Sequence, residues 1–260
     1  MSLDLALAGK TALVTGAARG LGFGIARALS EQGVAVAIND RTQEIAQQAA
    51  LRLGKGAIAV GADLATEAGP MHCVDQALRV LGGIDFIVNN AAINIENPID
   101  QTTDDLWDSH LNIILRAPHL IIARSLASLK QRKGAILNVA SELGLHAIAN
   151  NVAYVTAKHG LVSLTRAVAA EVASSGVRVN ALCPGTMDTE LMRECAAASG
   201  DPARYYAAFN AYHPVGRIAT PDEVARFALV MLSPLSSFMT GTAIAFDGGS
   251  TAARVWGALP

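Results

Sequence analysis

Charge is scarce in this chain of 260 residues: Asp, Glu, Lys and Arg make up 16% of it, and the formal net charge is −2. That balance gives no basic surface for nucleic acid or for an anionic membrane. No apolar run approaches the roughly 18 residues of a membrane span. The first residues also lack the basic head and apolar run of a secretion signal. We therefore expect a cytoplasmic protein with no nucleic-acid and no membrane partner.

Cysteine is equally sparse. Cys73, Cys183 and Cys195 are odd in number and widely spaced, without a CxxC pair. No His/Cys cluster has the spacing of metal ligands, so we expect a reduced chain that needs no metal. Cys183 ends an apolar run and is interpreted as a small core residue rather than a reactive thiol.

Apolar residues, by contrast, make up 52% of the chain, which indicates a large core or extensive subunit contacts. Short, continuously apolar runs alternate with longer helical patterns, as in parallel strands covered on both faces. This order predicts an α/β fold: a single doubly wound, Rossmann-type domain over residues 1–260, with a seven-stranded parallel sheet flanked by helices on both faces. The strand candidates are 10–15, 34–39, 57–61, 84–88, 134–140, 177–182 and 242–246, and helical stretches include 24–32, 69–81, 103–129, 154–174 and 221–232.

One long segment has no clear periodicity. It follows Pro184 and Gly185 and runs to about residue 216. Long irregular connections in compact domains are often lids or binding loops, so we expect a substrate lid at about 186–214. A surface insertion with its own small core explains the segment as well.

The first strand runs into a turn with glycines at positions 16, 20 and 22, and a helix follows. Glycine lets the backbone turn tightly and approach a pyrophosphate, while the helix N-terminus offers free N–H groups. Such turns also occur for close packing alone. The strand–turn–helix context nevertheless favours a dinucleotide site here.

Asp40 lies at the end of the second predicted strand, where a carboxylate can accept hydrogen bonds from the adenosine ribose. The same charge would repel a 2′-phosphate at short range, so NAD is favoured over NADP. Arg19 and Arg41 are both close enough in sequence to serve a phosphate instead. Asp40 as a simple turn residue is the other interpretation.

Tyr154 and Lys158 are four positions apart in a predicted helix, so their side chains project from one face. A free tyrosine has a pKa near 10, and lowering it by about 3 units requires about 4 kcal/mol of preferential interaction with the phenolate. A fixed ammonium favours the phenolate. We therefore expect Lys158 to lower the pKa of Tyr154 and make it a general acid/base. An amphipathic face without chemistry is the plainer interpretation.

Together these features closely resemble the short-chain dehydrogenase/reductase family over residues 9–249. One departure is Ala92, where the family usually has glycine, and the added methyl is expected to shift the local backbone slightly. The ordered motif residues are Thr15, Gly16, Gly20 and Gly22; Asp63 and Leu64; Asn89, Asn90, Ala91 and Ala92; Asn112, Ser141, Tyr154 and Lys158; Pro184, Gly185 and Thr189; and Asp247, Gly248 and Gly249.

The resemblance implies a catalytic set of Asn112, Ser141, Tyr154 and Lys158. Tyr154 would exchange a proton with the substrate oxygen, which Ser141 would orient. Lys158 would also hold the nicotinamide ribose, and Asn112 would organise a water relay to solvent. We further expect Pro118 to kink the helix that carries Asn112.

The resemblance also implies binding residues. Asp63 would meet the adenine, Asn90 would line the cleft, and the segment from Pro184 to Thr189 would receive the carboxamide. The substrate set is Ser141, Glu142, His146, Tyr154 and Met192. The cofactor set is Gly16, Arg19, Gly20, Leu21, Gly22, Asp40, Arg41, Asp63, Leu64, Asn90, Ala91, Tyr154, Lys158, Pro184, Gly185, Met187 and Thr189.

The expected reaction is hydride transfer between NAD and a secondary alcohol or ketone. Polar groups at Glu142, His146, Asn150 and Asn151 suit a sugar or polyol, whereas the aromatic residues of the 186–214 segment suit an apolar substrate. The alternatives are an NADP-dependent ketoreductase of the 3-oxoacyl-carrier type and a non-catalytic dinucleotide sensor. A serine hydrolase is excluded, because no Gly-x-Ser-x-Gly elbow surrounds Ser141.

Assembly is a further expectation. The low charge, the high apolar content and the family resemblance favour a closed homo-oligomer, a tetramer. The tail from Ala252 to Pro260, with Trp256, is expected to contact a neighbouring subunit, and a free tail is the other interpretation.

Overall fold

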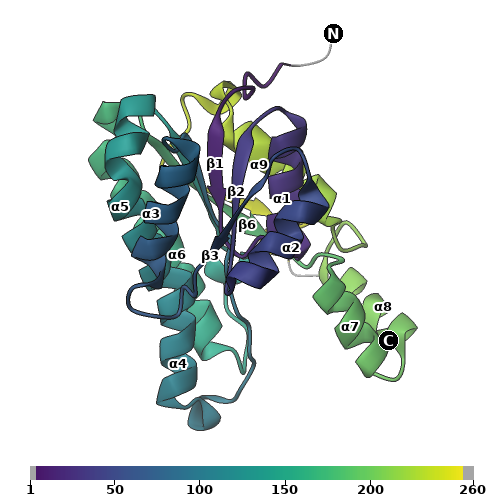
Figure 1. Ribbon diagram of the computed structural model, residues 1–260. Coiled ribbons are helices and arrows are strands. Elements are labelled where there is room, and N and C mark those ends of the chain that lie inside the picture. The colour runs from purple at the N-terminus through teal and green to yellow at the C-terminus, as the bar shows by residue number, and fades with distance from the viewer. Residues whose placement is uncertain (1–3, 254–260) are drawn as a thin grey trace.

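The protein, described by a computed structural model over residues 4–253, is built on one sheet (Figure 1). All its strands are parallel, and their order is β3-β2-β1-β4-β5-β6-β7. The predicted seven-stranded parallel sheet is confirmed. Its strands are β1 (Thr11–Val14), β2 (Ala35–Asp40), β3 (Ile58–Gly61), β4 (Phe86–Asn89), β5 (Ala135–Val139), β6 (Arg178–Pro184) and β7 (Ala243–Phe246).

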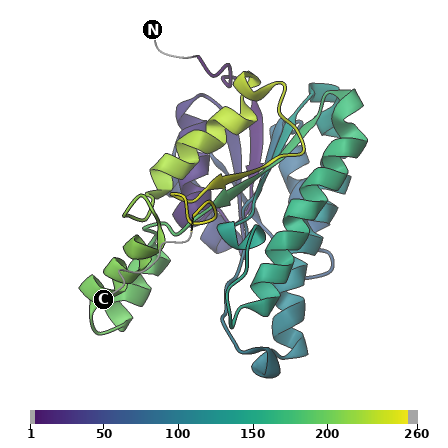
Figure 2. The same cartoon turned by 180° about the vertical axis from the view of Figure 1, so that it is seen from behind.

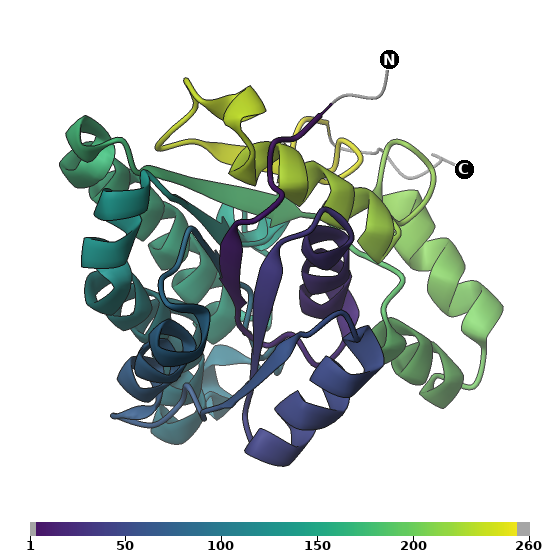
Figure 3. The same ribbon diagram turned by 45° about the horizontal axis from the view of Figure 1, so that its top comes forward.

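Helices cover the sheet on both faces because its strands are apolar on both faces. One core cluster joins the strands to α1, α2 and α9, and a second joins them to α3, α5 and α6. Figure 3 shows these two layers with the sheet between them. The helices are α1 (Gly20–Glu31), α2 (Gln43–Leu53), α3 (Gly69–Leu81), α4 (Asp104–Leu111), α5 (Ala117–Arg132), α6 (Val152–Val172), α7 (Glu190–Ala198), α8 (Pro202–Tyr212) and α9 (Pro221–Leu232), with short turns η1 (Ile99–Gln101), η3 (Glu142–Gly144), η4 (Ala173–Ser175) and η5 (Pro234–Ser236).

The interpretation of the segment after Gly185 as irregular is wrong, because it contains α7 and α8. Each helix has a side-chain cap, from Thr189 and Asp201. Only Met192 and Ala196 of α7 are buried, and no residue of α8 is. The apolar stripe of α8 is weak, whereas α7 has an apolar face as marked as that of α9. Figure 2 shows both helices projecting from the body of the fold.

The predicted proline kink is replaced by a π-turn. The helix from α4 to α5 continues through η2 (Asn112–Arg116), whose hydrogen bonds have π spacing: Ala117 N–H donates to Asn112 O. Leu111, Asn112 and Ala117 keep right-handed helical dihedral angles. Pro118 is the second residue of α5, directly after η2, so the continuous helix lacks one N–H donor at this position.

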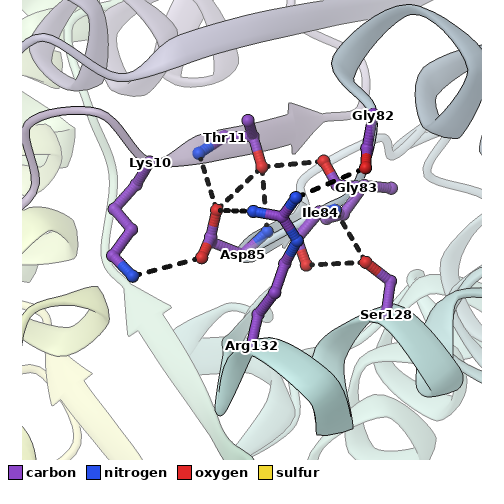
Figure 4. A network of polar contacts seen from close by, with 8 residues as sticks. All are labelled: Lys10, Thr11, Gly82, Gly83, Ile84, Asp85, Ser128 and Arg132. Carbon is purple, nitrogen blue, oxygen red and sulfur yellow. Dashed lines mark hydrogen bonds and ion pairs between the residues drawn. The ribbon is translucent and has the colours of Figure 1, made fainter.

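At the amino ends of the strands, a buried carboxylate joins β1 to α5 (Figure 4). Asp85 Oδ2 accepts hydrogen bonds from Thr11 N at 3.0 Å, Thr11 Oγ1 at 2.9 Å and Arg132 Nη1 at 3.0 Å. Its Oδ1 accepts one from Lys10 Nζ at 3.3 Å. Burial raises the pKa of Asp85, but the hydrogen bonds from Thr11 and Lys10 outweigh burial, and the net shift is downward.

Three further expectations concern Cys183, membrane-spanning helices and Trp256. Cys183 is buried in a core cluster, and burial raises the pKa of its thiol to about 11, which agrees with a core role. No helix among residues 4–253 has the length and apolar character needed to cross a membrane. Trp256, expected to contact a neighbouring subunit, lies outside the described residues.

Candidate active site

The predicted site residues gather where the strand order reverses. β1 and β4 are neighbours, but the chain continues from them in opposite directions across the sheet. In open α/β sheets, ligands bind at this point, beyond the carboxyl ends of the strands. Gly16 follows β1 and Asn90 follows β4, so both lie at this edge.

The glycine turn is shaped for close approach of a ligand to its backbone. Gly16 and Gly20 both have φ of +58°, a region that favours glycine. A Cβ on Gly22 would lie 2.4 Å from Asn90 Nδ2 and 2.5 Å from Gly16 O. Asn90 Nδ2 donates to Gly16 O and Thr15 O, at 3.0 Å each, and fixes the turn against β4. Leu21 is buried behind it. These residues fit a dinucleotide pyrophosphate at the N-terminus of α1.

Asp40 lies beside the same turn. Its Oδ2 accepts a hydrogen bond from Ala18 N at 3.0 Å, and its Oδ1 accepts one from Arg41 N at 2.8 Å. Each oxygen retains a lone pair for a further donor. Arg41 and Arg19 are exposed, and Arg19 forms an ion pair with Glu194 at 3.7 Å.

The other predicted cofactor residues follow neighbouring strands. Asp63 follows β3, and its Oδ1 accepts a hydrogen bond from Ala65 N at 3.0 Å, while Leu64 is buried. Pro184 ends β6, and Gly185 N donates to Phe246 O at 3.1 Å. Beyond them, Met187 forms a bridge with Ala219, and Thr189 caps α7. Ala91 N donates to Thr15 Oγ1 at 3.1 Å.

Ala92 does not need a glycine-like backbone. Positive φ among non-glycine residues of the described chain occurs at Ala6, Lys55, Lys133 and Asn150. The methyl that departs from the family motif is therefore accommodated without strain at this position.

The three central catalytic candidates come together at the end of β5. Ser141 caps η3, and its Oγ accepts a hydrogen bond from Leu143 N at 3.1 Å. Tyr154 is half-buried on α6, and the Nζ of Lys158 lies 5.5 Å from the centre of its ring. Lys158 is 2% exposed, and its Nζ donates to Val139 O at 2.7 Å.

The expected direction of the Tyr154 pKa shift is wrong. Burial raises the pKa of Tyr154 to about 12; the Ser141 side chain opposes this rise and the nearby Glu142 charge adds to it. Burial also lowers the pKa of Lys158 to about 7. Loss of hydration is the main cause of both shifts, and the Lys158 ammonium is turned to a backbone carbonyl rather than to the phenol oxygen.

Asn112 begins the π-turn η2, which packs against α6. Its neighbour His110 is fully buried, and its ring meets the ring of Tyr154 edge-on at 6.5 Å. His110 also binds the loop after β4, since Ile95 N donates to its Nε2 at 3.3 Å. No local sequence pattern marks this histidine, because its role depends on contacts between distant segments.

Polar side chains gather around Glu142, which directly follows Ser141. Glu142 is 6% exposed, its carboxylate accepts a hydrogen bond from Ser250, and burial raises its pKa. His146 Nε2 and the Tyr212 hydroxyl are hydrogen-bonded at 3.1 Å. Ser250 and Tyr212 were not predicted, since they come from the turn after β7 and the end of α8.

Two further polar side chains, those of His213 and Asn151, are also buried. His213 is buried: its Nδ1 donates to Asp247 O at 2.8 Å, and its Nε2 accepts from Thr186 N at 3.2 Å. Asn151 is 2% exposed, and neither atom of its amide has a hydrogen-bond partner among the described residues.

The aromatic residues of α8 pack within their own segment. Tyr205 and Phe209 lie 5.0 Å apart between ring centres, and the Tyr206 hydroxyl donates to Asp188 Oδ1 at 2.8 Å. Met192 of α7 is buried. The internal contacts of these aromatic rings favour the interpretation of a small local core over an apolar substrate surface.

Comparisons with known proteins agree with this geometry. A family model described as enoyl-(acyl carrier protein) reductase matches residues 16–251. The chain is 37% identical over 230 residues to inactive 2-(S)-hydroxypropyl-CoM dehydrogenase 2 of Xanthobacter autotrophicus, covering 88% of this chain and 100% of that protein. It is 38% identical over 251 residues to cis-4-hydroxycyclohexanecarboxylate dehydrogenase of Sinomonas cyclohexanicum, covering 95% and 98%.

Among solved structures, L-sorbose reductase from Gluconobacter frateurii, determined with NADPH and L-sorbose, has a TM-score of 0.93. It is 26% identical in sequence, and the match covers 97% of this chain and 100% of that one. The family match spans nearly the whole chain, and the fold and motif positions agree with it. This chain therefore belongs to the short-chain dehydrogenase/reductase family and is a nicotinamide-dependent oxidoreductase acting on CH–OH groups.

Proposed function

We propose that this chain transfers hydride between NAD and a secondary alcohol or ketone, with Tyr154 as the acid/base. The observation that carries the proposal is the placement of Ser141, Tyr154 and Lys158 at the edge of the sheet that also holds the glycine turn. These groups come from β5 and α6, and the turn follows β1.

A nicotinamide dinucleotide held by the glycine turn would supply the hydride acceptor for an alcohol carbon, or the hydride donor for a ketone carbon. Tyr154 exchanges a proton with the substrate oxygen, and the Ser141 hydroxyl donates a hydrogen bond to that oxygen. Lys158, whose Nζ lies 5.5 Å from the centre of the Tyr154 ring, would hold the nicotinamide ribose. Asn112 organises a water relay between Lys158 and solvent. No metal takes part in these steps.

Substitution of the tyrosine tests this assignment. Tyr154→Phe removes the only atom that exchanges the proton, so turnover is expected to fall by a factor of about 10² to 10⁴ or more. NADH binding should be nearly unchanged. Tyr205→Phe is the matched comparison: it removes a phenol hydroxyl from the proposed lid, where the ring packs on Phe209, and should leave most of the turnover. A Tyr154→Phe enzyme with a substantial fraction of the wild-type rate would rule out this proton donor.

NAD is the proposed cofactor, because the Asp40 carboxylate beside Ala18 would repel a 2′-phosphate. The rival is an NADP-dependent ketoreductase of the 3-oxoacyl-carrier type, and the NADPH named with L-sorbose reductase supports it. Dissociation constants for NADH and NADPH separate the two proposals. Tighter binding of NADPH would reject the NAD assignment.

The proposed substrate is a sugar or polyol, and the α7–α8 segment at about 186–214 acts as its lid. Buried Glu142, next to Ser141, and the His146–Tyr212 pair near it offer hydrogen-bonding groups, and L-sorbose is named with the related reductase. The test is a panel of alcohols, polyols, sugars and hydroxysteroids, followed by the absorbance of the reduced cofactor. A chain that binds NADH but oxidises none of them would favour a non-catalytic sensor instead.

A cytoplasmic homotetramer is the proposed form of the enzyme. β7 forms one edge of the sheet, and Phe238 just before it is fully exposed, so apolar surface is available there for a second subunit. Sedimentation at micromolar concentration tests the assembly. A monomer alone would reject it.

A further inference from the structure

A carboxylate from α7 occupies the start of α1. Glu190 Oε2 accepts a hydrogen bond from Gly20 N at 3.1 Å, although the two residues are 170 positions apart. Gly20 is the first residue of α1, and Phe23 is the first whose N–H bonds back to Arg19 O. The Gly20 amide is therefore one of the donors that a helix leaves free at its N-terminus.

Nothing on α1 itself serves this amide. Its N-cap residue, Arg19, makes no side-chain cap hydrogen bond, and its first turn contains no acidic residue. The free amides and the positive end of the helix dipole are therefore available to an anion from elsewhere. In this structure that anion is the Glu190 side chain.

A second charged contact holds the same two segments together. Arg19 Nη1 and Glu194 Oε1 lie 3.7 Å apart, and both side chains are 62% exposed. Glu190 and Glu194 are one helical turn apart on α7, so they face the glycine turn together. Thr189 lies close to the same turn, since a Cβ built on Gly20 would be 3.8 Å from its Cγ2.

We propose that Glu190 sets cofactor affinity by competing with the dinucleotide pyrophosphate for the Gly20 amide, so that the nucleotide binds only when α7 moves away from α1. The proposal rests on the proposed function, because it needs a dinucleotide at this turn. The competition follows from charge, because a carboxylate and a pyrophosphate that approach the same amide repel each other strongly. The affinity observed is the intrinsic affinity multiplied by the fraction of molecules in which Glu190 has left.

The two acidic residues should act differently on the two cofactors. The pyrophosphate is common to NADH and NADPH, so removing the Glu190 charge should strengthen both equally. Glu194 instead neutralises Arg19, which is exposed and able to reach a 2′-phosphate. Glu194→Gln should therefore strengthen NADPH binding more than NADH binding.

The main experiment compares Glu190→Gln with wild type by NADH and NADPH fluorescence titration. Gln keeps the size of the side chain and removes its charge, so we expect the dissociation constants to fall about three- to tenfold. Glu171→Gln is the matched control: it is exposed near the far end of α6, changes the net charge equally, and should leave both constants unchanged. In about 1 M salt the difference between Glu190→Gln and wild type should shrink towards none, because the contact is exposed and charged.

A structural readout accompanies the affinities. Without nucleotide, trypsin should cut at Arg193 of α7 faster in Glu190→Gln than in wild type or Glu171→Gln. Unchanged or weaker nucleotide binding in both Glu190→Gln and Glu190→Ala would overturn the proposal. That result differs from failure of the proposed function, in which wild type itself binds neither nucleotide.

Discussion

Replacing Gly22 with alanine tests whether close approach, rather than backbone freedom, requires glycine in the turn. An added Cβ would lie 2.4 Å from Asn90 Nδ2 and 2.5 Å from the Gly16 carbonyl oxygen. The first overlap displaces an amide that makes two hydrogen bonds, each worth about 1 kcal/mol. The second overlap involves backbone, and overpacking of this kind costs about 1–3 kcal/mol.

Helix propensity offsets about 1 kcal/mol of this cost, since alanine is the better helix former. The net effect of Gly22→Ala is therefore a loss of about 2–4 kcal/mol of unfolding free energy. Gly24→Ala is the control on the same helix. Its Cβ would meet its nearest neighbour, the Ala225 Cβ, at 3.7 Å, an ordinary contact. It should gain up to about 1 kcal/mol.

Thermal and urea unfolding measure the two variants side by side. At about 2–4 °C per kcal/mol, Gly22→Ala should lower Tm by roughly 5–15 °C, and Gly24→Ala should raise it by a few degrees. NADH binding should weaken at least about tenfold in Gly22→Ala alone, because the turn must shift. Equal melting temperatures and equal NADH affinities for the two variants would refute the reasoning.

Two other predictions concern protons. Asp85→Asn should lower the free energy of unfolding by about 2–4 kcal/mol, because it removes the buried negative charge that pairs with Arg132 and Lys10. Asp75→Asn, which removes the exposed pair with Arg124, should change that free energy little. Because the pKa of Asp85 is lowered in the folded state, the carboxylate stabilises the fold above its unfolded pKa of about 3.9, and this stabilisation is lost as the pH falls below that value. The urea midpoints of wild type and Asp85→Asn should therefore converge at low pH. The raised Tyr154 pKa of about 12 keeps the phenol protonated at neutral pH. The kcat/KM for alcohol oxidation, which needs the phenolate, should therefore rise with pH, whereas the kcat/KM for ketone reduction should not. An oxidation profile that is flat from about pH 7 to pH 10 would contradict this.

The strands were predictable because burial on both faces leaves a continuous apolar run that needs no knowledge of neighbours. Helix α8 was not, because it buries no residue and has only a weak apolar stripe, and α7 was missed although its nine residues do have an apolar face. Their capping residues, Thr189 and Asp201 with Pro202, were visible in the sequence and would have signalled two helix starts. The π-turn at Asn112 was also beyond prediction, since a helix and a π-turn share the same dihedral region and differ in hydrogen bonding.

The site residues likewise divide into those that sequence spacing predicts and those that only the fold brings together. Ser141, Tyr154 and Lys158 have fixed spacings and follow elements that the sequence predicts, so their meeting at one edge was foreseeable. Glu190, Ser250 and His110 act through segments distant in the chain, and no local pattern marks them. Glu190 in particular looks like an ordinary first-turn acid of α7, and only the fold brings it to α1.

The Tyr154–Lys158 pair shows what spacing alone leaves undetermined. Four residues along a helix fix the direction in which both side chains point, but the depth of that face depends on how closely α6 packs on β6 and η3. At this depth one carbonyl, that of Val139, replaces only part of the water an ammonium loses, so the pKa of Lys158 stays near 7. A lysine acidifies a tyrosine only while it carries its charge. Any contact that gives Lys158 Nζ further acceptors would therefore raise its pKa and lower that of Tyr154 together, which couples the proton chemistry of the pair to whatever binds beside it.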